Sequence, residues 1–383
     1  MTLSRRSLIL GLAGSGLALT AAAGAYRVSR LPRTAAAPWH LGPAPADVRL
    51  DALRHAILAP NPHNRQPWLM RLVGDDRVTV SCELDRRLPQ TDPFDRQITV
   101  GFGCFLELAR IAAAERGHRM ETEAFPEGEP QPRLDARPVA VLTFRRDDGV
   151  PRDPLFAQIP VRRSTKEPYD LARPVGTEAF AALGRAGGEE VVMSGTAEPA
   201  RVAALREVAL AAGAIEAATA RTHQESVDVI RIGHREIDAN PDGIDLDGPM
   251  IEGLKLAGRI SREQIADPGS TAYKVGMDRN RAVYGSVPAY LWIKTAGNAR
   301  ADQLAAGRAY VRANLAGTAL GLCMHPASQA LQEFPEMREP FERMHALLGA
   351  NGAERVQMLA RIGYGPLVPP SPRWPVESRI VPA

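Results

Sequence analysis

The 383-residue sequence is poor in cysteine and holds none of the short motifs that mark several large enzyme classes. Its three cysteines, Cys82, Cys104 and Cys323, are widely spaced and form no CxxC pair, which argues against a disulfide framework or a zinc site and predicts free, buried thiols. The sequence also lacks GxxxxGK, a GxGxxG after a strand, HExxH and GxSxG. These absences exclude most nucleotide hydrolases, Rossmann dehydrogenases, zinc proteases and α/β-hydrolases.

The chain also carries little net charge and little lysine. The formal net charge is +3, and only four of the 47 basic residues are lysines, a bias that we attribute to genomic base composition. Such a small charge gives no reason to expect a nucleic acid partner. The composition, 45% hydrophobic and 24% charged, is typical of a soluble globular protein, and the length is sufficient for two domain-sized units.

The first 25 residues form a separate segment. Arg5 and Arg6 precede an uncharged apolar run over residues 8–25, which ends in a small-x-small cleavage pattern. This segment resembles a twin-arginine export signal, so we expect a periplasmic protein. The alternative is an uncleaved anchor that holds the protein on the membrane facing outward, because about 18 apolar residues nearly span a bilayer core. Residues 26–43 have several prolines and no periodicity, and we expect a linker there.

The remaining sequence alternates between helical and strand patterns and predicts an α+β fold with α/β layering, in which mixed or antiparallel sheets are flanked by helices. We divide it into a first lobe, residues 44–159, and a second lobe, residues 160–383. Residues 98–117 are apolar nearly all round and predict a buried central helix. A long helical stretch is expected over residues 198–231. Residues 240–295 are rich in turn residues and too long for a connector, which is typical of a lid or a binding loop.

The central helix has a counterpart later in the chain, at residues 301–322. Aligning Gly103 with Gly307 also aligns Gly117 with Gly321, and an apolar strand follows each helix. Small residues at matching places let two buried helices approach closely. The pattern predicts an internal duplication.

A rigid polar turn, NPHNRQPW, occupies residues 61–68. Its prolines stiffen the backbone, while His63, Asn64 and Gln66 offer hydrogen-bonding groups. A loop of this kind suits a flat heterocycle with several acceptor atoms. The alternative is a structural turn between a helix and a strand, with Trp68 as its anchor in the core.

Two basic strings in the second lobe are candidate phosphate sites. RRSTK, residues 162–166, places three cations and two hydroxyls together at the expected start of a helix, which suits a phosphate. The alternative is a solvated basic turn. Arg373 lies in a proline-rich tail and can bring a further charge to the same phosphate, unless the tail only wraps the surface.

These strings together resemble the motifs of the FMN-dependent nitroreductase superfamily. RRSTK resembles the amino-terminal phosphate motif of that superfamily, and residues 59–68 resemble its P-S-x-x-N-x-Q-P-W motif. Residues 317–331 look like its A-L-G-L segment and the proline loop that follows, and residues 361–375 are similar to its closing segment with a terminal arginine. Each match alone is weak, but four matches spread over most of the chain are specific.

The order of the motifs is inverted relative to ordinary members of the superfamily, because N-x-Q-P-W lies in the first half and the phosphate motif opens the second. This arrangement resembles the tandem-lobe, Acg-type branch, whose H-N-x-Q-P-W string is present as residues 63–68. The resemblance implies two nitroreductase-like lobes that form a pseudo-dimer in one chain. One flavin site would then lie between the lobes, and a homo-oligomer is not required.

The resemblance also implies FMN as the cofactor, with no metal. Arg162, Ser164 and Lys166 would hold its phosphate and ribityl chain together with Arg373, while Asn64 and Gln66 would reach the isoalloxazine ring from the other lobe. The backbone N–H groups of Ala327 and Ser328 would lie near flavin N5, so that no side chain acts as an obligatory acid or base. The full set of predicted cofactor-binding residues is Asn61, His63, Asn64, Gln66, Arg162, Ser164, Lys166, Pro326, Ser328, Gln329 and Arg373.

The sequence departs from the family pattern at three motifs. Asn61 replaces a serine, Ser371 replaces a basic residue, and Ser328 with Gln329 replaces an acidic residue after the proline loop. The loss of a cation at Ser371 weakens the expected phosphate site slightly, whereas Asn61 can still form hydrogen bonds.

The expected function is that of an FMN-binding oxidoreductase of nitroreductase type. It would pass a hydride through flavin N5 from a reduced nicotinamide, NAD(P)H, or another donor to a nitroaromatic or quinone-like acceptor, a small-molecule partner. The alternative is an FMN-sequestering protein with a covered flavin and little turnover, because residues 240–295 fall where a lid would lie. A third possibility is an envelope protein that kept the fold without the cofactor.

Overall fold

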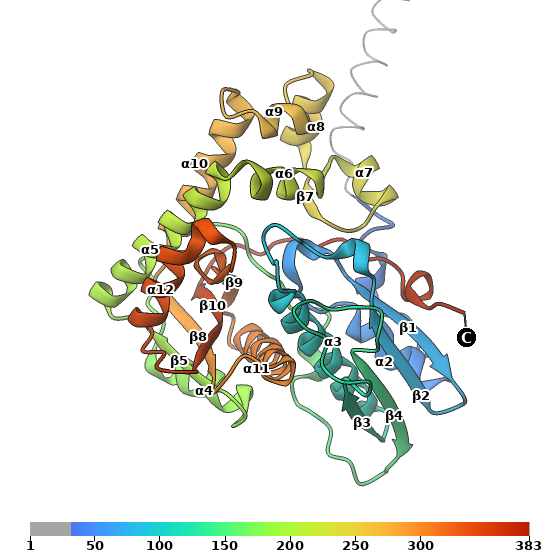
Figure 1. Cartoon of the computed structure of the whole chain (residues 1–383). Coiled ribbons are helices and arrows are strands. Elements are labelled where there is room, and N and C mark those ends of the chain that lie inside the picture. Colours follow the sequence, from blue (N-terminus) through green and yellow to red (C-terminus); the bar gives the residue numbers. More distant parts are fainter. Residues whose placement is uncertain (1–31, 383) are drawn as a thin grey trace, which may run out of the picture.

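The computed structural model of the chain describes residues 32–382 (Figure 1). The predicted export signal, residues 1–25, lies outside the described residues. The helices and strands, in chain order, are α2 (Val48–Ala56), β1 (Trp68–Val73), β2 (Arg77–Cys82), α3 (Arg96–Glu115), β3 (His118–Ala124), β4 (Ala140–Arg146), α4 (Thr177–Gly187), β5 (Val192–Thr196), α5 (Pro199–Ala218), α6 (Ala220–Asp228), β6 (Ile230–Ile232), α7 (His234–Ala239), β7 (Ile244–Leu246), α8 (Pro249–Leu256), α9 (Arg262–Ala266), α10 (Thr271–Gly285), β8 (Ala289–Thr295), α11 (Arg300–Ala319), β9 (Cys323–Pro326), α12 (Arg338–Leu347) and β10 (Arg355–Gly363).

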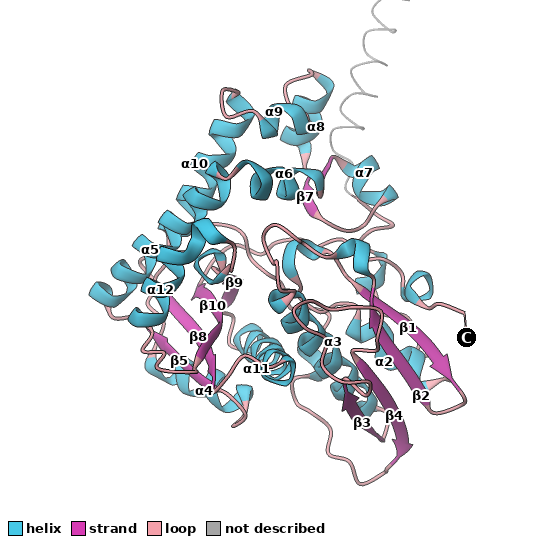
Figure 2. Ribbon diagram, viewed as in Figure 1, coloured by secondary structure: helices cyan, strands magenta, loops and turns pink. Residues whose placement is uncertain are grey.

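Two four-stranded sheets organise the fold, one in each lobe (Figure 2). The strand order is β1-β2-β4-β3 in the first sheet and β5-β8-β10-β9 in the second, and all neighbouring strands are antiparallel. Of the strands in each sheet, two precede a 20-residue helix in the chain and two follow it. The short strands β6 and β7 form a separate parallel pair in the second lobe. The expected mixed α+β architecture, with two sheets and flanking helices, is confirmed.

The two 20-residue helices, α3 and α11, pack against each other between the sheets (Figure 1). They cross at Gly103 and Gly307. A Cβ on Gly103 would collide with the backbone carbonyl of Leu304, and a Cβ on Gly307 would collide with that of Val100. The helices approach this closely because neither position has a side chain. The internal duplication stays a prediction, supported by the matching strand orders and by these facing glycines.

Among residues 32–382, α3 has the length and the apolar composition that could cross a membrane. Most of that helix is buried in the protein, between the two sheets. This helix is therefore apolar because it lies in the core of the fold, as the sequence predicted.

Two predicted segments have different boundaries in the structure. Residues 198–231 form two helices, α5 and α6, followed by β6, rather than one long helix. The predicted lid, residues 240–295, includes β8, a buried central strand of the second sheet, and this part of the prediction is wrong. A central strand is covered on both faces and reads as a continuous apolar run without alternation, which hides it in the sequence. The part inserted before β8 is residues 199–285, called the cover segment below.

The predicted linker is also more ordered than expected, because residues 34–43 pack against the fold. Trp39 is buried, and its indole N–H donates to the carbonyl oxygen of Ser371 at 2.7 Å. The backbone N–H of Arg373 donates to the carbonyl oxygen of Ala35 at 2.9 Å. Beyond this point the C-terminal tail crosses to the first lobe, where Ile380 forms a β-bridge with Met70. The end of the predicted second lobe therefore packs on the first sheet.

Candidate functional site

The polar turn at residues 61–68 is strained and tightly bonded. His63, Asn64 and Gln66 have positive φ angles of 46°, 52° and 49°, in the left-handed region that residues other than glycine rarely adopt. The Asn61 side chain closes the turn, because its Oδ1 accepts the N–H of Gln66 at 2.7 Å and its Nδ2 donates to the Ala59 carbonyl at 3.1 Å. Backbone strain of this kind concentrates at ligand-binding sites. Asn61, predicted as a cofactor ligand, acts here within the turn.

Asn64 joins this turn to the C-terminal tail of the other lobe. Its Oδ1 accepts a 2.6 Å hydrogen bond from Nη1 of Arg373, and its Nδ2 donates to the Pro372 carbonyl at 3.0 Å. The structure therefore brings together two residues, Asn64 and Arg373, that the sequence predicted at one site.

Gln66 is completely buried, and protein groups use both ends of its amide. Oε1 accepts the backbone N–H of Trp374 at 3.0 Å, and Nε2 donates to the Pro241 carbonyl at 2.8 Å. Gln66 thus ties the turn to the tail and to the cover segment. A direct bond to a flavin would require one of these bonds to be exchanged.

Arg162 and Arg373 form the electrostatic centre of the site. Both side chains are buried, and both donate to the carbonyl oxygen of Leu58, at 2.9 and 3.3 Å. Burial lowers the pKa of Arg162 to about 10 and, with the neighbouring Arg162 charge, that of Arg373 to about 9. Both groups are still charged at neutral pH.

The other partners of these two guanidinium groups are neutral. Arg162 Nη1 contacts the side-chain oxygen of Asn314 at 3.0 Å and the hydroxyl of Ser164 at 3.5 Å, and Arg373 Nη2 contacts the Ala59 carbonyl at 3.1 Å. The Nε atoms of both arginines are buried without a hydrogen-bond partner. Two buried like charges that are hydrogen-bonded only to neutral groups are costly, and a bound anion would offset that cost.

Trp39 covers the cations from the side of the N-terminal segment. The guanidinium carbons of Arg162, Arg163 and Arg373 lie 5.7, 4.7 and 5.2 Å from the centre of its ring. Such cation–π contacts stabilise desolvated guanidinium groups. The sequence reasoning missed Trp39 because it lies in a proline-containing segment with no periodicity.

The RRSTK string lies in irregular backbone, so the predicted helix start at this position is wrong. The next helix, α4, begins at Thr177. Pro168 follows closely and disfavours helical backbone in the residue before it. Helix N–H groups are therefore absent from this part of the site, and the charge comes from side chains. Lys166 is exposed, and its Nζ lies 3.7 Å from the carboxylate of Asp245 in the cover segment.

The loop after β9 provides the last predicted residues. Pro326 ends the strand, and the N–H of Ala327 donates to the Leu359 carbonyl at 2.8 Å. The prediction that this N–H faces flavin N5 is wrong, because it is bonded to β10. The backbone N–H of Ser328 remains the candidate. The amide of Gln329 donates to the hydroxyl of Tyr284 at 3.1 Å, while its Oε1 is buried without a partner.

Two histidines near this loop are neutral at physiological pH. Burial lowers the pKa of His63 to about 4 and, with the neighbouring Arg361 charge, moves that of His325 well below its ordinary value. Lys166 contributes to both shifts, so the RRSTK string lies close to the turn and to β9 alike. Arg361 Nε lies 3.0 Å from Nδ1 of His325, which fixes that ring as the acceptor. His325 is a further site residue that the sequence reasoning missed.

These residues fit an FMN molecule. A flavin mononucleotide combines a dianionic phosphate with a flat ring rich in hydrogen-bonding atoms. The two buried guanidinium groups and Lys166 supply positive charge for the phosphate. The unpartnered His63 Nδ1 and Gln329 Oε1, together with Ser328, supply polar groups for the ring.

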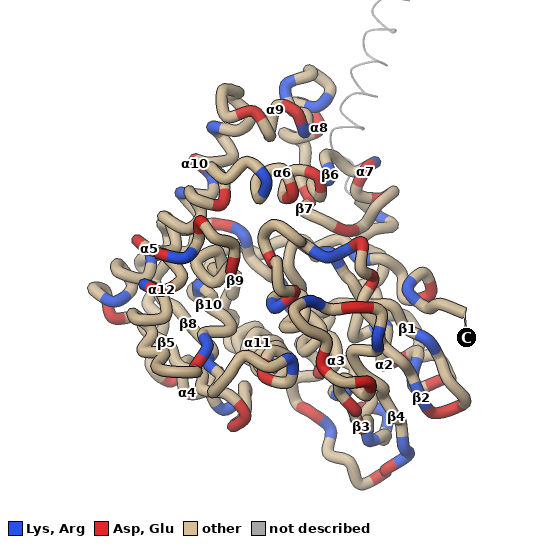
Figure 3. The backbone as a smooth tube through the Cα atoms, in the orientation of Figure 1, with Lys and Arg blue, Asp and Glu red and all other residues tan. Residues whose placement is uncertain are grey.

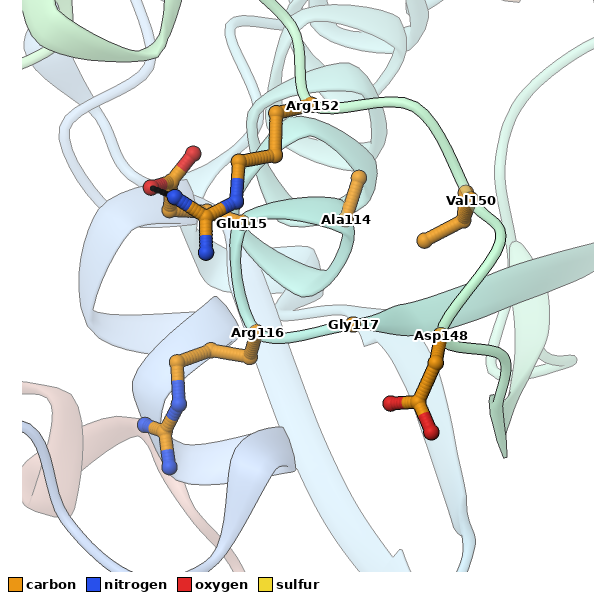
Figure 4. A pocket seen from close by; sticks show the side chains of 7 residues that line it. All are labelled: Ala114, Glu115, Arg116, Gly117, Asp148, Val150 and Arg152. Carbon is orange, nitrogen blue, oxygen red and sulfur yellow. Dashed lines mark ion pairs between the residues drawn. The ribbon is translucent and has the colours of Figure 1, made fainter.

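Basic and acidic residues are otherwise interspersed along both lobes (Figure 3). A separate surface hollow lies where α3 ends, lined in part by Glu115, Arg116, Asp148 and Arg152 (Figure 4). There Arg152 pairs with Glu115 at 3.4 Å, and Arg116 reaches Asp51 at 2.7 Å. Its charges are thus paired within the protein, unlike those of Arg162 and Arg373. Within residues 32–382 no group of three or more potential ligands is arranged to hold a metal ion.

Comparison with known proteins places the chain near the nitroreductases. No protein-family model matches the sequence. The chain is 25% identical over 344 residues to the Mycobacterium tuberculosis protein named "Putative NAD(P)H nitroreductase Rv3131", an alignment that covers 87% of this chain and 93% of that one. It is 37% identical over 81 residues to the M. tuberculosis protein named "Putative NAD(P)H nitroreductase acg", covering 21% of this chain and 24% of the other.

Solved nitroreductase structures align with part of the chain. The FMN-dependent nitroreductase NfnB from Mycobacterium smegmatis, in complex with NADPH, is 17% identical with a TM-score of 0.35, covering 57% of this chain and 92% of that chain. A nitroreductase with bound FMN from Bacteroides fragilis is 14% identical with a TM-score of 0.33, covering 56% of this chain and 89% of that chain. The chain is thus similar in sequence to proteins named as nitroreductases, as expected, over nearly the whole length of the first relative.

Proposed function

We propose that this protein binds FMN between its two lobes and acts as an oxidoreductase of nitroreductase type. The observation that carries the proposal is the pair of buried guanidinium groups, Arg162 and Arg373, which meet at one carbonyl oxygen and have no carboxylate among their hydrogen-bond partners. A phosphate is a ligand that suits such a pair. The sequence similarity to proteins named NAD(P)H nitroreductases supports the same conclusion.

Bound FMN would supply hydride transfer through its N5 atom. The residues of this chain would bind and orient it. Arg162, Arg373 and Lys166 would hold the phosphate, and Trp39 would keep water from the two buried guanidinium groups. The strained turn would present His63 from the first lobe, with Asn64 bonded to Arg373 and Pro372. Ser328 and Gln329 would face the ring from the second lobe.

The proposed electron donor is a reduced nicotinamide, and the proposed acceptor is a nitroaromatic or quinone-like compound. The names of the relatives support this choice. The purified protein should show the yellow absorbance of a flavin, or take it up from added FMN. A colourless protein that takes up no FMN would contradict the proposal.

A second candidate function is FMN storage beneath the cover segment. The observation that favours it is the contact of that segment with the turn: Gly243 N–H donates to the Asn64 carbonyl at 3.1 Å, and Gln66 bonds to Pro241. A nicotinamide would have to displace these residues to reach the flavin from this side. Under anaerobic NADPH, bleaching of the flavin supports turnover, whereas bleaching only by dithionite supports storage.

The tandem-lobe arrangement, the export route and the single-chain site remain part of this proposal. The matching strand orders of the two sheets and the crossing of the C-terminal tail support one site built within one chain. Fractionation of cells should find the protein in the periplasm or on the outer side of the inner membrane. Sedimentation should show that a monomer retains FMN.

A further inference from the structure

A second polar cluster lies on the cover-segment side of the site and is built around Glu216. Glu216 stands near the end of α5, and the hydroxyl of Thr222 donates to its backbone carbonyl at 2.7 Å, which fixes the corner between α5 and α6. Ser226 and Gln332 lie beside its carboxyl group and favour its ionised form. The Glu216 side chain is surrounded by protein but retains some exposed surface.

Two neighbours of Glu216 link it to both halves of the proposed FMN site. Ser226 Oγ lies 3.4 Å from Nε2 of His63, on the turn of the first lobe. Gln332 directly follows the short 3-10 helix Gln329–Leu331, which begins behind Ser328. Glu216 is thus one side chain away from the turn and one side chain away from the loop where the reactive edge of the flavin is proposed.

One polar atom in this cluster has no partner and is not assigned to the flavin. Oε1 of Gln332 is buried without a hydrogen bond. Tyr284 continues the cluster, because its hydroxyl accepts from Gln329 at 3.1 Å and its ring lies 5.7 Å from that of His325. Buried polar groups in folded proteins nearly always have partners, so unpartnered atoms point to a missing ligand.

The electrostatics of the cluster favour uncharged groups. Burial raises the pKa of Glu216 to about 7, with a further rise from Glu225 and an opposing effect of Gln332 and Ser226. The ionisable groups that face it are Glu225 on α6, Tyr284 on α10 and, through Ser226, the neutral His63. None of the groups that shift its pKa is a lysine or an arginine. Near neutral pH much of the Glu216 population therefore carries a proton that it can share.

We propose that Glu216 is a specificity-determining residue, which donates a hydrogen bond to an oxygen of an uncharged electron acceptor such as a nitro compound or a quinone. This inference rests on the proposed function, since the acceptor must reach the flavin. The cluster supplies the remaining contacts through Ser226, Tyr284 and Gln332. An ionised Glu216 offers only acceptor oxygens and repels the same ligand.

The test measures binding rather than turnover. 4-Nitrobenzamide, an uncharged nitro compound, is titrated calorimetrically into the oxidised FMN-loaded protein without reductant, at about pH 6 and about pH 8.5. In the unmodified protein the Kd should rise about tenfold between the two pH values, as a hydrogen bond is lost. Glu216→Gln keeps a donor and does not titrate, so its Kd should stay constant within about twofold over this range. Glu216→Ala should bind 4-nitrobenzamide weakly at both pH values.

Glu207→Gln is the matched control, because Glu207 lies on the same helix in an exposed ion pair with Arg343. Its Kd for 4-nitrobenzamide should rise between the two pH values as much as that of the unmodified protein. A tenfold pH effect that persists in Glu216→Gln, or unchanged binding by Glu216→Ala, would overturn the inference. The FMN content of each sample is measured by its absorbance. A protein without FMN overturns the proposed function. A protein that holds FMN but whose Kd for 4-nitrobenzamide does not depend on Glu216 overturns this inference alone.

Discussion

Arg162 and Arg373, far apart in the sequence, donate to the same carbonyl oxygen, that of Leu58, at 2.9 and 3.3 Å. One comes from the RRSTK string and the other from the C-terminal tail, while the shared acceptor precedes the strained turn of the first lobe. Three distant segments therefore meet at one point. The charge they gather there is not balanced by a hydrogen-bonded carboxylate, which is why the pair dominates the proposed phosphate site.

Replacing Arg373 with Gln should separate binding from stability. FMN affinity should fall at least about tenfold, because a charge-assisted contact to phosphate is lost. The stability of the flavin-free protein should change by no more than about 1 kcal/mol, because lost hydrogen bonds to Asn64 and Ala59 are offset by relief of repulsion with Arg162. Fluorescence titration with FMN and urea unfolding measure the two effects.

Arg343→Gln is the control for that substitution, because Arg343 is exposed in an ion pair with Glu207. Exposed pairs of this type contribute little to stability. Both FMN affinity and stability should match the unmodified protein. An Arg373→Gln variant that binds FMN normally would remove Arg373 from the site.

The crossing of α3 and α11 should not tolerate a methyl group. Gly103→Ala or Gly307→Ala places a Cβ against the backbone of the other helix, so the helices must separate and the free energy of unfolding should fall by about 2–3 kcal/mol. Gly213→Ala in α5 is the control, because nothing lies within 4 Å of its added Cβ. That change should stabilise the protein by about 0.5–1 kcal/mol, since alanine favours helix over glycine. Equal effects at all three positions would contradict the close approach.

Local patterns in the sequence predicted the central helices, several strands and the main polar strings. Residues 98–117 were identified because a helix that is apolar all round has to be buried. The placement of Asn64 and Arg373 at one site followed from the family resemblance, whereas their direct hydrogen bond was not predicted. The helix expected at RRSTK failed because Pro168 restricts the backbone just beyond it.

Contacts between distant segments could not be predicted from the sequence. Trp39 stacks on three arginines, one of which is Arg373 from the far end of the chain, and no periodicity marks such a contact. The same holds for Ala327, whose N–H looked available until the pairing of β9 with β10 placed it against Leu359. Both depend on how the sheets and the tail assemble.

Asp242 should control how firmly the cover segment is held. Its buried carboxylate pairs with Arg231 of the cover segment at 2.8 Å and with two arginines of the first lobe, Arg65 at 3.4 Å and Arg86. Asp242→Asn leaves these three cations without their shared counter-charge, which should cost about 3–5 kcal/mol of local stability. Amide hydrogen exchange should then rise in residues 229–247 more than in the two central helices.

The control for this change is Asp278→Asn, because Asp278 is highly exposed in its pair with Arg281. Exchange in that variant should be unchanged. If the storage function is correct, Asp242→Asn should also speed the bleaching of bound flavin by NADPH. Unaltered exchange in residues 229–247 would show that Asp242 does not hold the cover segment.

Glu216 should make stability depend on pH in a defined direction. Its pKa is raised to about 7 in the folded protein, from an ordinary value of 4.5. Between these values the folded state keeps a proton that the unfolded chain has lost, so the free energy of unfolding decreases as the pH rises. The contribution is complete below pH 4.5 and is lost above about pH 7. Allowing for partial exposure, we expect a loss of about 2 kcal/mol.

Glu216→Gln does not titrate, so its stability relative to the unmodified protein should rise by about that amount between acidic and mildly alkaline pH. Urea unfolding at saturating FMN measures the difference at each pH, with Glu207→Gln as the control that should show a constant offset. A Glu216→Gln curve parallel to that of the unmodified protein would place the titration on another group.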